Sequence, residues 1–281
     1  MKLENYESLE EKGEIFKSSG YLRIDTVANF CDWFDAFSKE NILFRGVKEA
    51  KYKIYTSAQR LYITHDLALS GKSVEDLINE VLKQVKQQND GLLKKYFRSM
   101  NGADYDMLYL SYLQHYSGIS PLLDFTTSCD KALFFMQDKS CFEKNGEDGI
   151  GNYFSLYMIG NQPENRKIYN LTDEFIQDMF SFKTMKEYAK SIVFQSGQLN
   201  LSQHKKYSFA NLNLVAQDGR FVFYCNGTEP MENNISCVDI HKSIAPYIKK
   251  ELEKKGITKE SIYPQEEKIA RLALQRALES I

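Results

Sequence analysis

Residues 111–136, SYLQHYSGISPLLDFTTSCDKALFFM, place an acid and three hydroxylic side chains between two apolar segments. The first segment predicts an apolar-faced helix that stops at the Gly-Ile-Ser-Pro break, and the second predicts a buried helix. Capping of that second helix accounts for one of the hydroxyls Thr126, Thr127 and Ser128, because a cap uses a single side-chain oxygen. Asp124 can accept hydrogen bonds from a ligand or fix an arginine, and the helix N-terminus can bind an anion. The stretch is therefore a candidate binding site.

The segments on either side alternate between helix and strand without a regular strand–helix–strand repeat. Helical spacing of apolar residues predicts helices over 25–40, 74–98, 105–117, 172–190, 242–257 and 266–280. Short apolar runs predict strands over 42–44, 52–56, 151–160 and 235–241, and a hairpin within 210–227. This mixture predicts an α+β fold with a single domain, in which a mixed or antiparallel sheet is flanked by helices. We divide the chain into an N-terminal extension (1–24), the domain (25–264) and a C-terminal helix (265–281).

The composition has no strong charge bias. Lys and Arg total 36 against 38 for Asp and Glu, so the net charge of -2 gives no signal for nucleic acid or an anionic membrane as a partner. No apolar run approaches the roughly 18 residues of a membrane span, and the charged N-terminus is unlike a signal peptide. We therefore expect a cytoplasmic protein. Five cysteines without a CxxC pair argue against disulfides and a zinc site, so we expect free buried thiols and no metal.

Three further polar residues are candidates for a site. Arg45 ends an apolar strand beside Gly46, where its guanidinium can clamp a phosphate or carboxylate or else pair with an internal acid. His115 lies on the apolar helix and is either a core histidine or a general base. Gln217, in the turn Gln-Asp-Gly, either faces a ligand or only reverses the chain. The sequence contains none of the usual nucleotide-loop, Rossmann, zincin or hydrolase motifs.

Taken together, these segments resemble the FRG-domain family of bacterial and phage proteins. LFRG at 43–46 matches the motif that names the family, and YKIYTSAQR, which ends at Arg60, resembles the family's W-x-L-x-P-S-x-x-R without its proline. LQHYSGISPLLDFTTSCDKALFF resembles LQHYG-x-P-T-x-LLDWT followed by A-L-x-F, with Phe125 in place of Trp. NLVAQDGRFVFY and the tail at 240–264 resemble the two later elements of the family. The family resemblance implies an effector in host–phage conflict, with phage defence, a toxin-like action and a protein partner.

The order of the motifs also resembles that of the ADP-ribosyltransferases. That family places an Arg on a first strand, then Ser-Thr-Ser, then a Glu on a later strand. Arg45, the hydroxyls at 126–128 and the Gln217 strand follow this order. The resemblance implies NAD as a substrate, with the arginine at its phosphates or ribose and the hydroxyls beneath its nicotinamide ribose. Position 219 is Gly where the resemblance expects Glu, so Asp218 or Asp124 takes that role, or the site binds without catalysis.

Three hypotheses follow. The first is an NAD-utilising enzyme of the ADP-ribosyltransferase type, and the second is a non-catalytic module that senses a nucleotide or a phage component in the same cleft. The third is that the motifs only determine the fold, with Arg45 and Asp124 in a buried ion pair. The residues expected to be catalytic are Arg45, Asp124 and Gln217. The residues expected to bind the ligand are Arg45, Gly46, Arg60, His115, Thr126, Thr127, Ser128 and Gly219.

Overall fold

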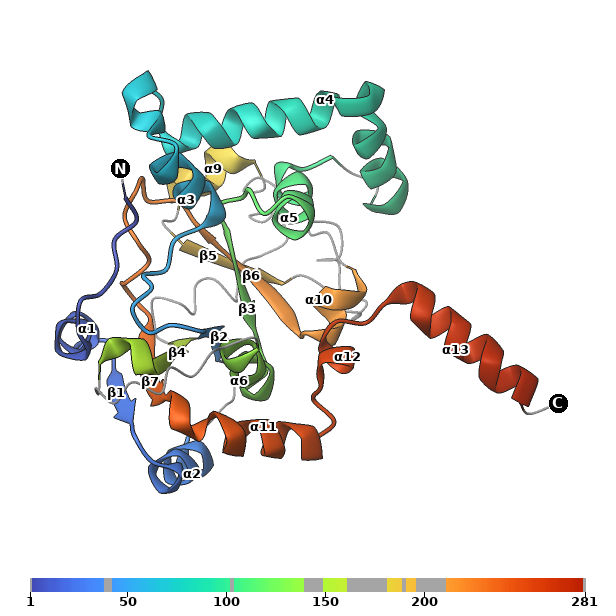
Figure 1. Cartoon of the computed structure of the whole chain (residues 1–281). Helices are drawn as coiled ribbons and strands as arrows, with labels where there is room; N and C mark the ends of the chain where they lie inside the picture. Colours follow the sequence, from blue (N-terminus) through green and yellow to red (C-terminus); the bar gives the residue numbers. More distant parts are fainter. Residues whose placement is uncertain are drawn as a thin grey trace.

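The computed structural model describes residues 2–37, 42–101, 104–138, 149–160, 181–188, 191–195 and 211–279. Its core is one seven-stranded sheet with the strand order β1-β7-β4-β2-β3-β6-β5 (Figure 1). The strands are β1 (Tyr21–Ile24), β2 (Leu43–Val47), β3 (Leu122–Thr126), β4 (Tyr153–Ile159), β5 (Ser191–Gln195), β6 (Gly219–Tyr224) and β7 (Ser236–His241). The β1–β7 pair is parallel and the other five pairs are antiparallel. The predicted α+β fold with a mixed sheet flanked by helices is confirmed.

Helices pack on the sheet because alternate strand residues point to opposite faces. The helices are α1 (Leu9–Phe16), α2 (Val27–Ala36), α3 (Ser57–Thr64), α4 (Val74–Asn101), α5 (Asp106–Tyr116), α6 (Cys129–Gln137), α9 (Phe182–Tyr188), α10 (Leu212–Ala216), α11 (Ala245–Lys254), α12 (Lys259–Ile262) and α13 (Glu266–Glu279), with short 3-10 turns η1 (Leu67–Ser70), η2 (Ile150–Asn152) and η4 (Lys242–Ile244). On one face, β3 and β6 pack against α3, α4, α5 and α9, while β2, β4 and β7 pack against α2, α6 and α11. The other face packs against the N-terminal segment through Tyr6 and Phe16.

β2 and β3 are joined at one point in the described part of the chain, where Phe44 lies opposite Thr126. On its other side each strand is paired along five residues, β2 with β4 and β3 with β6. Regular pairing holds strands about 4.8 Å apart. A single pair therefore leaves β2 and β3 free to diverge beyond Phe44. The sheet opens beside Arg45 and Asp124, in its middle and not at an edge.

Three local predictions are wrong. Residues 52–56 are not a strand, because their buried apolar side chains lead into Thr56, which caps α3. Residues 212–216 are helical, because the side chain of Asn211 caps α10, so the predicted hairpin is a helix followed by a strand. β2 runs on to Val47, which places Arg45 inside a strand and not at its end. Of the helix predicted over 172–190, α9 lies within the described residues and the part before residue 181 does not.

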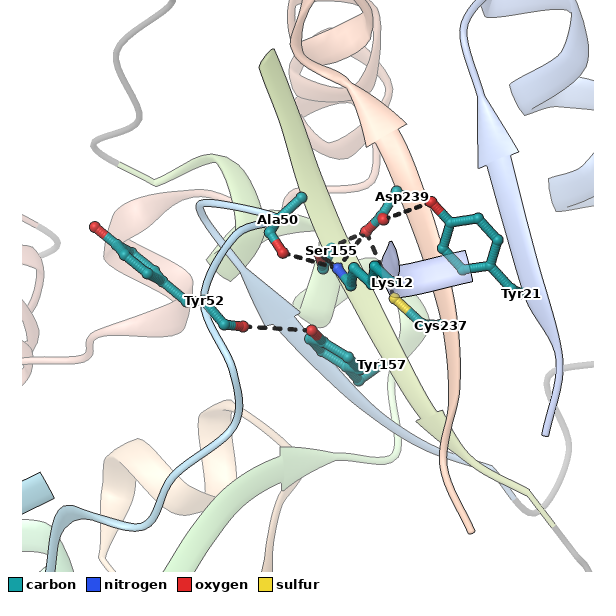
Figure 2. Close-up of polar contacts among 8 residues, drawn as sticks. All are labelled: Lys12, Tyr21, Ala50, Tyr52, Ser155, Tyr157, Cys237 and Asp239. Carbon is teal, nitrogen blue, oxygen red and sulfur yellow. Dashed lines mark hydrogen bonds and ion pairs between the residues drawn. The ribbon is translucent and has the colours of Figure 1, made fainter. Parts of the chain in front are cut away.

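A buried ionic cluster fixes the N-terminal helix α1 to the sheet (Figure 2). Lys12 is completely buried, and its Nζ donates to Asp239 Oδ1 on β7 at 2.7 Å and to Ser155 Oγ on β4 at 2.6 Å. Nζ also donates to the carbonyl oxygen of Ala50 at 2.9 Å and lies 5.0 Å from the ring centroid of Tyr157. An unpaired buried charge is strongly unfavourable. This set of acceptors is therefore what allows a lysine inside the protein.

Asp239 is the centre of the same cluster. Its Oδ1 also accepts from Ser155 Oγ at 2.6 Å, and its Oδ2 accepts from the Tyr21 hydroxyl at 2.9 Å. Burial and the negative charge of Asp239 raise the pKa of Tyr21 and of Cys237 above their ordinary values. Both groups therefore stay protonated beside the carboxylate. The segment predicted as an extension is thus part of the fold: β1 pairs with β7 at the edge of the sheet, and α1 is attached to the sheet through Lys12.

The cysteines in the described ranges are free thiols, namely Cys31, Cys129, Cys225 and Cys237, the last three of them buried. The expectation of free thiols is confirmed for these four, and Cys141 lies outside the described residues. Within the same ranges, no helix has the length and apolar character needed to cross a bilayer. No group of three or more His, Cys, Asp and Glu side chains in the described structure is arranged to bind a metal ion.

Candidate functional site

A cavity of about 310 Å³ lies where β2 and β3 diverge. Its walls come from β2, β3, the end of α6, the α10–β6 turn and the residue after α12. Six residues predicted for the site line it, namely Arg45, Gly46, Asp124, Thr126, Gln217 and Gly219. The fold thus brings three segments that are far apart in the sequence into one concave site.

Arg45 spans the gap between the two strands. Its Nη1 donates to the main-chain carbonyl of Asp124 at 2.5 Å, and its Nε is buried without a hydrogen-bond partner in the described structure. Burial lowers the pKa of the guanidinium, Asp124 raises it, and the positive charge of Arg60 lowers it further. A guanidinium has five N–H donors. Arg45 therefore holds unused donors at the wall of the cavity.

The carboxylate of Asp124 is held by Gln114 and not by Arg45. Gln114 Nε2, on α5, donates to Asp124 Oδ2 at 2.7 Å, so the direct ion pair considered from the sequence is not formed. Solvent reaches the Asp124 side chain from the cavity, while protein encloses it on the other sides. This enclosure raises the pKa of the carboxyl above its ordinary value, against the opposite effects of Arg45, Gln114 and His115. Asp124 thus takes up a proton more readily than an exposed aspartate, a property of groups that transfer protons.

We expect Asp124→Asn to remain folded and to be slightly more stable than the native protein at neutral pH. A carboxyl whose pKa is raised in the folded state binds its proton more tightly there than in the unfolded chain. As pH rises from the ordinary pKa of 3.8 toward the raised pKa, the carboxyl therefore lowers the free energy of unfolding of the native protein. Asparagine is neutral throughout and still accepts the Gln114 hydrogen bond. Urea unfolding should show an advantage for the variant at neutral pH that disappears below pH 3.8, and a less stable variant at neutral pH would contradict this account.

The three consecutive hydroxyls join neighbouring elements. Thr126 Oγ1 donates to the carbonyl of Gln217 at 2.7 Å and accepts the main-chain N–H of Ser128 at 3.0 Å. Ser128 Oγ caps α6 by accepting a main-chain N–H at 3.3 Å. The main-chain N–H of Thr127 donates to the carbonyl of Asp218 at 3.2 Å, and its side chain is exposed. Of the three, Thr126 lines the cavity, and its hydroxyl positions Gln217.

The two glycines of the cavity allow a helix to approach a strand. A Cβ on Gly46 would lie 2.8 Å from the main-chain nitrogen of Met136 and still closer to the carbonyl oxygen of Ala132, both on α6. A Cβ on Gly219 would lie 2.9 Å from Leu214 Cδ2 on α10. Real side chains do not pack this closely. Packing therefore explains both glycines, whatever they contribute to a ligand.

Two other predicted residues lie beside the cavity and are not part of its lining. Arg60, on α3, is exposed and acts electrostatically on Arg45. His115, on α5, packs edge-on against the ring of Tyr116, with centroids 4.9 Å apart. Burial lowers the pKa of His115, and the charge of Asp124 raises it. Both residues therefore influence the charged groups of the site from its surroundings.

The chain between α12 and α13 closes one side of the cavity. Tyr263 lines it and packs against the ring of Phe135, with centroids 6.2 Å apart. Gln217 lines the cavity too, but its Nε2 donates to the carbonyl of Ile262 at 3.2 Å. Burial and the neighbouring Asp138 raise the pKa of the Tyr263 hydroxyl. Gln217 thus connects the α10–β6 turn to the C-terminal wall.

Residues 40–145 match the family model described as FRG domain. The chain carries an FRG domain. No curated protein and no solved structure matches the chain. The matched part of the FRG domain runs from β2 through α6 and supplies Arg45, Asp124 and Thr126. Gln217 and Gly219 complete the cavity from outside the matched segment, and the wider limits of 25–264 stay a prediction.

Sequence reasoning missed two basic residues of the cavity. Lys48 is exposed on the turn after β2. Arg220 is 6% exposed, and its Nη1 donates to the preceding carbonyl at 2.8 Å. Lys48 follows LFRG by two positions and Arg220 lies within NLVAQDGRFVFY, so their places in or beside these motifs were the available signal. Together with Arg45 they place three cations in a cavity with two acids, Asp124 and Asp138.

Proposed function

We propose that the cavity of this FRG-domain protein binds a small anionic ligand of the nucleotide class. The observation that carries the proposal is the guanidinium of Arg45, which makes one hydrogen bond within the described structure and buries an Nε without a partner. An unsatisfied buried donor costs about 1–3 kcal/mol. A phosphate oxygen that accepts from this guanidinium offsets that cost. Lys48 and Arg220 line the same cavity and add positive charge.

The remaining walls suit an organic phosphate better than a bare ion. Phe135 and Tyr263 supply aromatic surface on the side of the cavity formed by α6 and the C-terminal segment. The volume of about 310 Å³ is near the lower end of the range of about 300–1,000 Å³ typical of small-molecule sites. This size fits a mononucleotide, or one half of a dinucleotide such as NAD.

Thermal unfolding with AMP, ADP, NAD and inorganic phosphate as probes tests the proposal. A ligand at about 100 times its Kd stabilises the folded protein by about 2.7 kcal/mol, so at least one nucleotide should raise Tm. Lys48→Gln should lower the affinity for that nucleotide about tenfold, since a hydrogen bond to a charged group contributes about 1.5 kcal/mol or more. Lys250→Gln, which removes an exposed lysine of α11 outside the cavity, should not change the affinity. The proposal would be refuted if no nucleotide raised Tm, or if Lys48→Gln and Lys250→Gln lowered the affinity for the nucleotide equally.

A second candidate function is an NAD-utilising reaction of the ADP-ribosyltransferase type in the same cavity. In that reaction the bond between nicotinamide and ribose C1′ breaks, nicotinamide leaves, and a nucleophile of the acceptor forms the new bond to C1′. A carboxylate stabilises the positive charge that develops on the ribose. Asp124 supports this candidate because it places a carboxylate in the cavity beside Arg45. Position 219, where the resemblance to ADP-ribosyltransferases expects Glu, is glycine.

The two candidates differ in turnover. Incubation of the protein with labelled NAD and cell lysate should release nicotinamide if the reaction occurs, and Asp124→Asn should abolish the release. A nucleotide that raises Tm without any release favours the non-catalytic sensing module. The resemblance of the motifs to the FRG-domain family supports placing either function in phage defence, with a toxin-like action and a protein partner.

A further inference from the structure

Asp124 places a negative charge beside Arg45, in a cavity that holds three cations and one further acid, Asp138. Arg45 does not neutralise this carboxylate, because its hydrogen bond goes to the main-chain carbonyl of the same residue. Gln114 donates to Oδ2, and no other side chain among the described residues donates to this carboxylate. A bare anion that binds to Arg45 therefore meets a like charge next to it, which weakens its binding.

A ligand relieves this repulsion when it brings a hydrogen-bond donor to the carboxylate. A carboxylate accepts hydrogen bonds and cannot donate them. Since Arg45 Nη1 lies 2.5 Å from the carbonyl of Asp124, the donor has to be near the group that binds Arg45. The hydroxyls of a sugar are close to its phosphate, whereas the amino groups of a base are farther away. The geometry therefore favours a sugar hydroxyl at Asp124.

The orienting group of Asp124 is neutral. Gln114 comes from the end of α5, and its amide nitrogen donates to the carboxylate at 2.7 Å. Its amide oxygen lies 3.5 Å from Ser57 Oγ on α3, whose hydroxyl also donates to the carbonyl of Ser120 at the shorter distance of 3.0 Å. A lysine or arginine in place of Gln114 would cancel the charge of Asp124. The amide fixes the carboxylate and leaves that charge in place.

Resting on the proposed function, we propose that Asp124, oriented by Gln114, selects phosphate ligands that carry neighbouring sugar hydroxyls. The same carboxylate rejects bare polyanions such as pyrophosphate. Asp124 is the residue that determines specificity, and Gln114 is a positioning residue that acts through it. Selection of this kind combines an attraction for the right ligand with a repulsion of the wrong one.

Calorimetric titration with AMP, 2′,3′-dideoxy-AMP and pyrophosphate tests this selection. The first two probes differ only in the sugar hydroxyls. The native protein should prefer AMP over its dideoxy analogue by about tenfold or more, because a hydrogen bond to a charged group contributes about 1.5–3 kcal/mol. Asp124→Asn should reduce this preference severalfold and should bind pyrophosphate severalfold more tightly than the native protein. A damaged site would bind all three probes more weakly. It would not lose the preference for AMP over its dideoxy analogue and at the same time gain affinity for pyrophosphate.

Two further variants separate positioning from general damage. Gln114→Leu should change both affinities in the same direction as Asp124→Asn, and it should have no further effect in the Asp124→Asn background, because both act through one carboxylate. Asp130→Asn is the matched control, since Asp130 is an acid of the first turn of α6 that pairs with Lys255 at 2.8 Å and does not line the cavity. Its affinities should equal those of the native protein.

The outcomes distinguish the two proposals. Two results would overturn the selection by Asp124 and leave the proposed function standing. One is that Asp124→Asn binds AMP and keeps the native preference for AMP over its dideoxy analogue. The other is that the native protein binds AMP and the analogue with equal affinity. Absence of binding by any nucleotide would overturn the proposed function and this inference with it.

Discussion

Lys12→Met is expected to lower the free energy of unfolding by about 3–5 kcal/mol, because removal of one member of a buried ion pair leaves the other charge uncompensated. Methionine matches the length of the lysine side chain but donates no hydrogen bond. Asp239 would keep its bonds from Ser155 and Tyr21 and lose its only cationic partner within the described residues. A loss of this size is a large fraction of the stability of a typical domain. Urea unfolding monitored by circular dichroism measures it.

The matched control is Lys17→Met, directly after the same helix. Lys17 pairs with Glu14 at 3.1 Å, but its side chain is 73% exposed, and we expect a change of about 0.5 kcal/mol or less. Lys12→Met combined with Asp239→Asn should lose less stability than the sum of the two single changes, because asparagine leaves no uncompensated charge. Similar losses for Lys12→Met and Lys17→Met would show that the buried cluster does not stabilise the fold.

Gly46→Ala is the second change with a large expected effect, a loss of about 3 kcal/mol or more in the free energy of unfolding. Overpacking of a well-packed core commonly costs about 1–3 kcal/mol, and here the new methyl group meets main-chain atoms of α6 that cannot rotate away. β2 and α6 would have to separate. Urea unfolding gives the loss, and ligand binding to the cavity checks whether the shift of β2 reaches Arg45.

Gly149→Ala is the control for this prediction. A Cβ on Gly149 has no neighbour within 4 Å, and its φ of -76° suits alanine. We expect a change within about 0.5 kcal/mol, or a small gain from the reduced freedom of the unfolded chain. Equal stabilities of the two alanine variants would show that β2 does not depend on close contact with α6.

The convergence of Arg45, Asp124 and Gln217 could be predicted from the sequence because each residue belongs to a recognisable motif. The motifs did not show what the side chains bind. One of the three hypotheses paired Asp124 with Arg45, but its carboxylate binds Gln114, and the hydroxyls at 126–128 mostly join main-chain segments. Partners of this kind depend on how β2 and β3 diverge, which local sequence patterns do not encode.

Other parts of the molecule had no sequence signal. Tyr263 joins the cavity because α12 packs beside α10, and Lys12 is buried because three distant acceptors meet around it. The turn signal at Gln217-Asp218-Gly219 predicted a hairpin with a strand before it, but the Asn211 cap made residues 212–216 helical. Element type was predictable where apolar periodicity ran over several turns, and less so where one polar side chain decided it.

The buried cluster around Lys12 also constrains the order in which the chain can fold. Lys12 and Asp239 are 227 positions apart, so the contact closes a very long loop and its entropy cost is met only once much of the sheet exists. Contacts of such high sequence separation slow folding. During synthesis from the N-terminus, α1 emerges long before β7, and Lys12 has no acid to pair with in the interior until Asp239 has left the ribosome. The ion pair between Lys12 and Asp239 therefore forms only after β7 has been synthesised, whereas the contact of Lys12 with the carbonyl of Ala50 spans 38 positions and can form earlier.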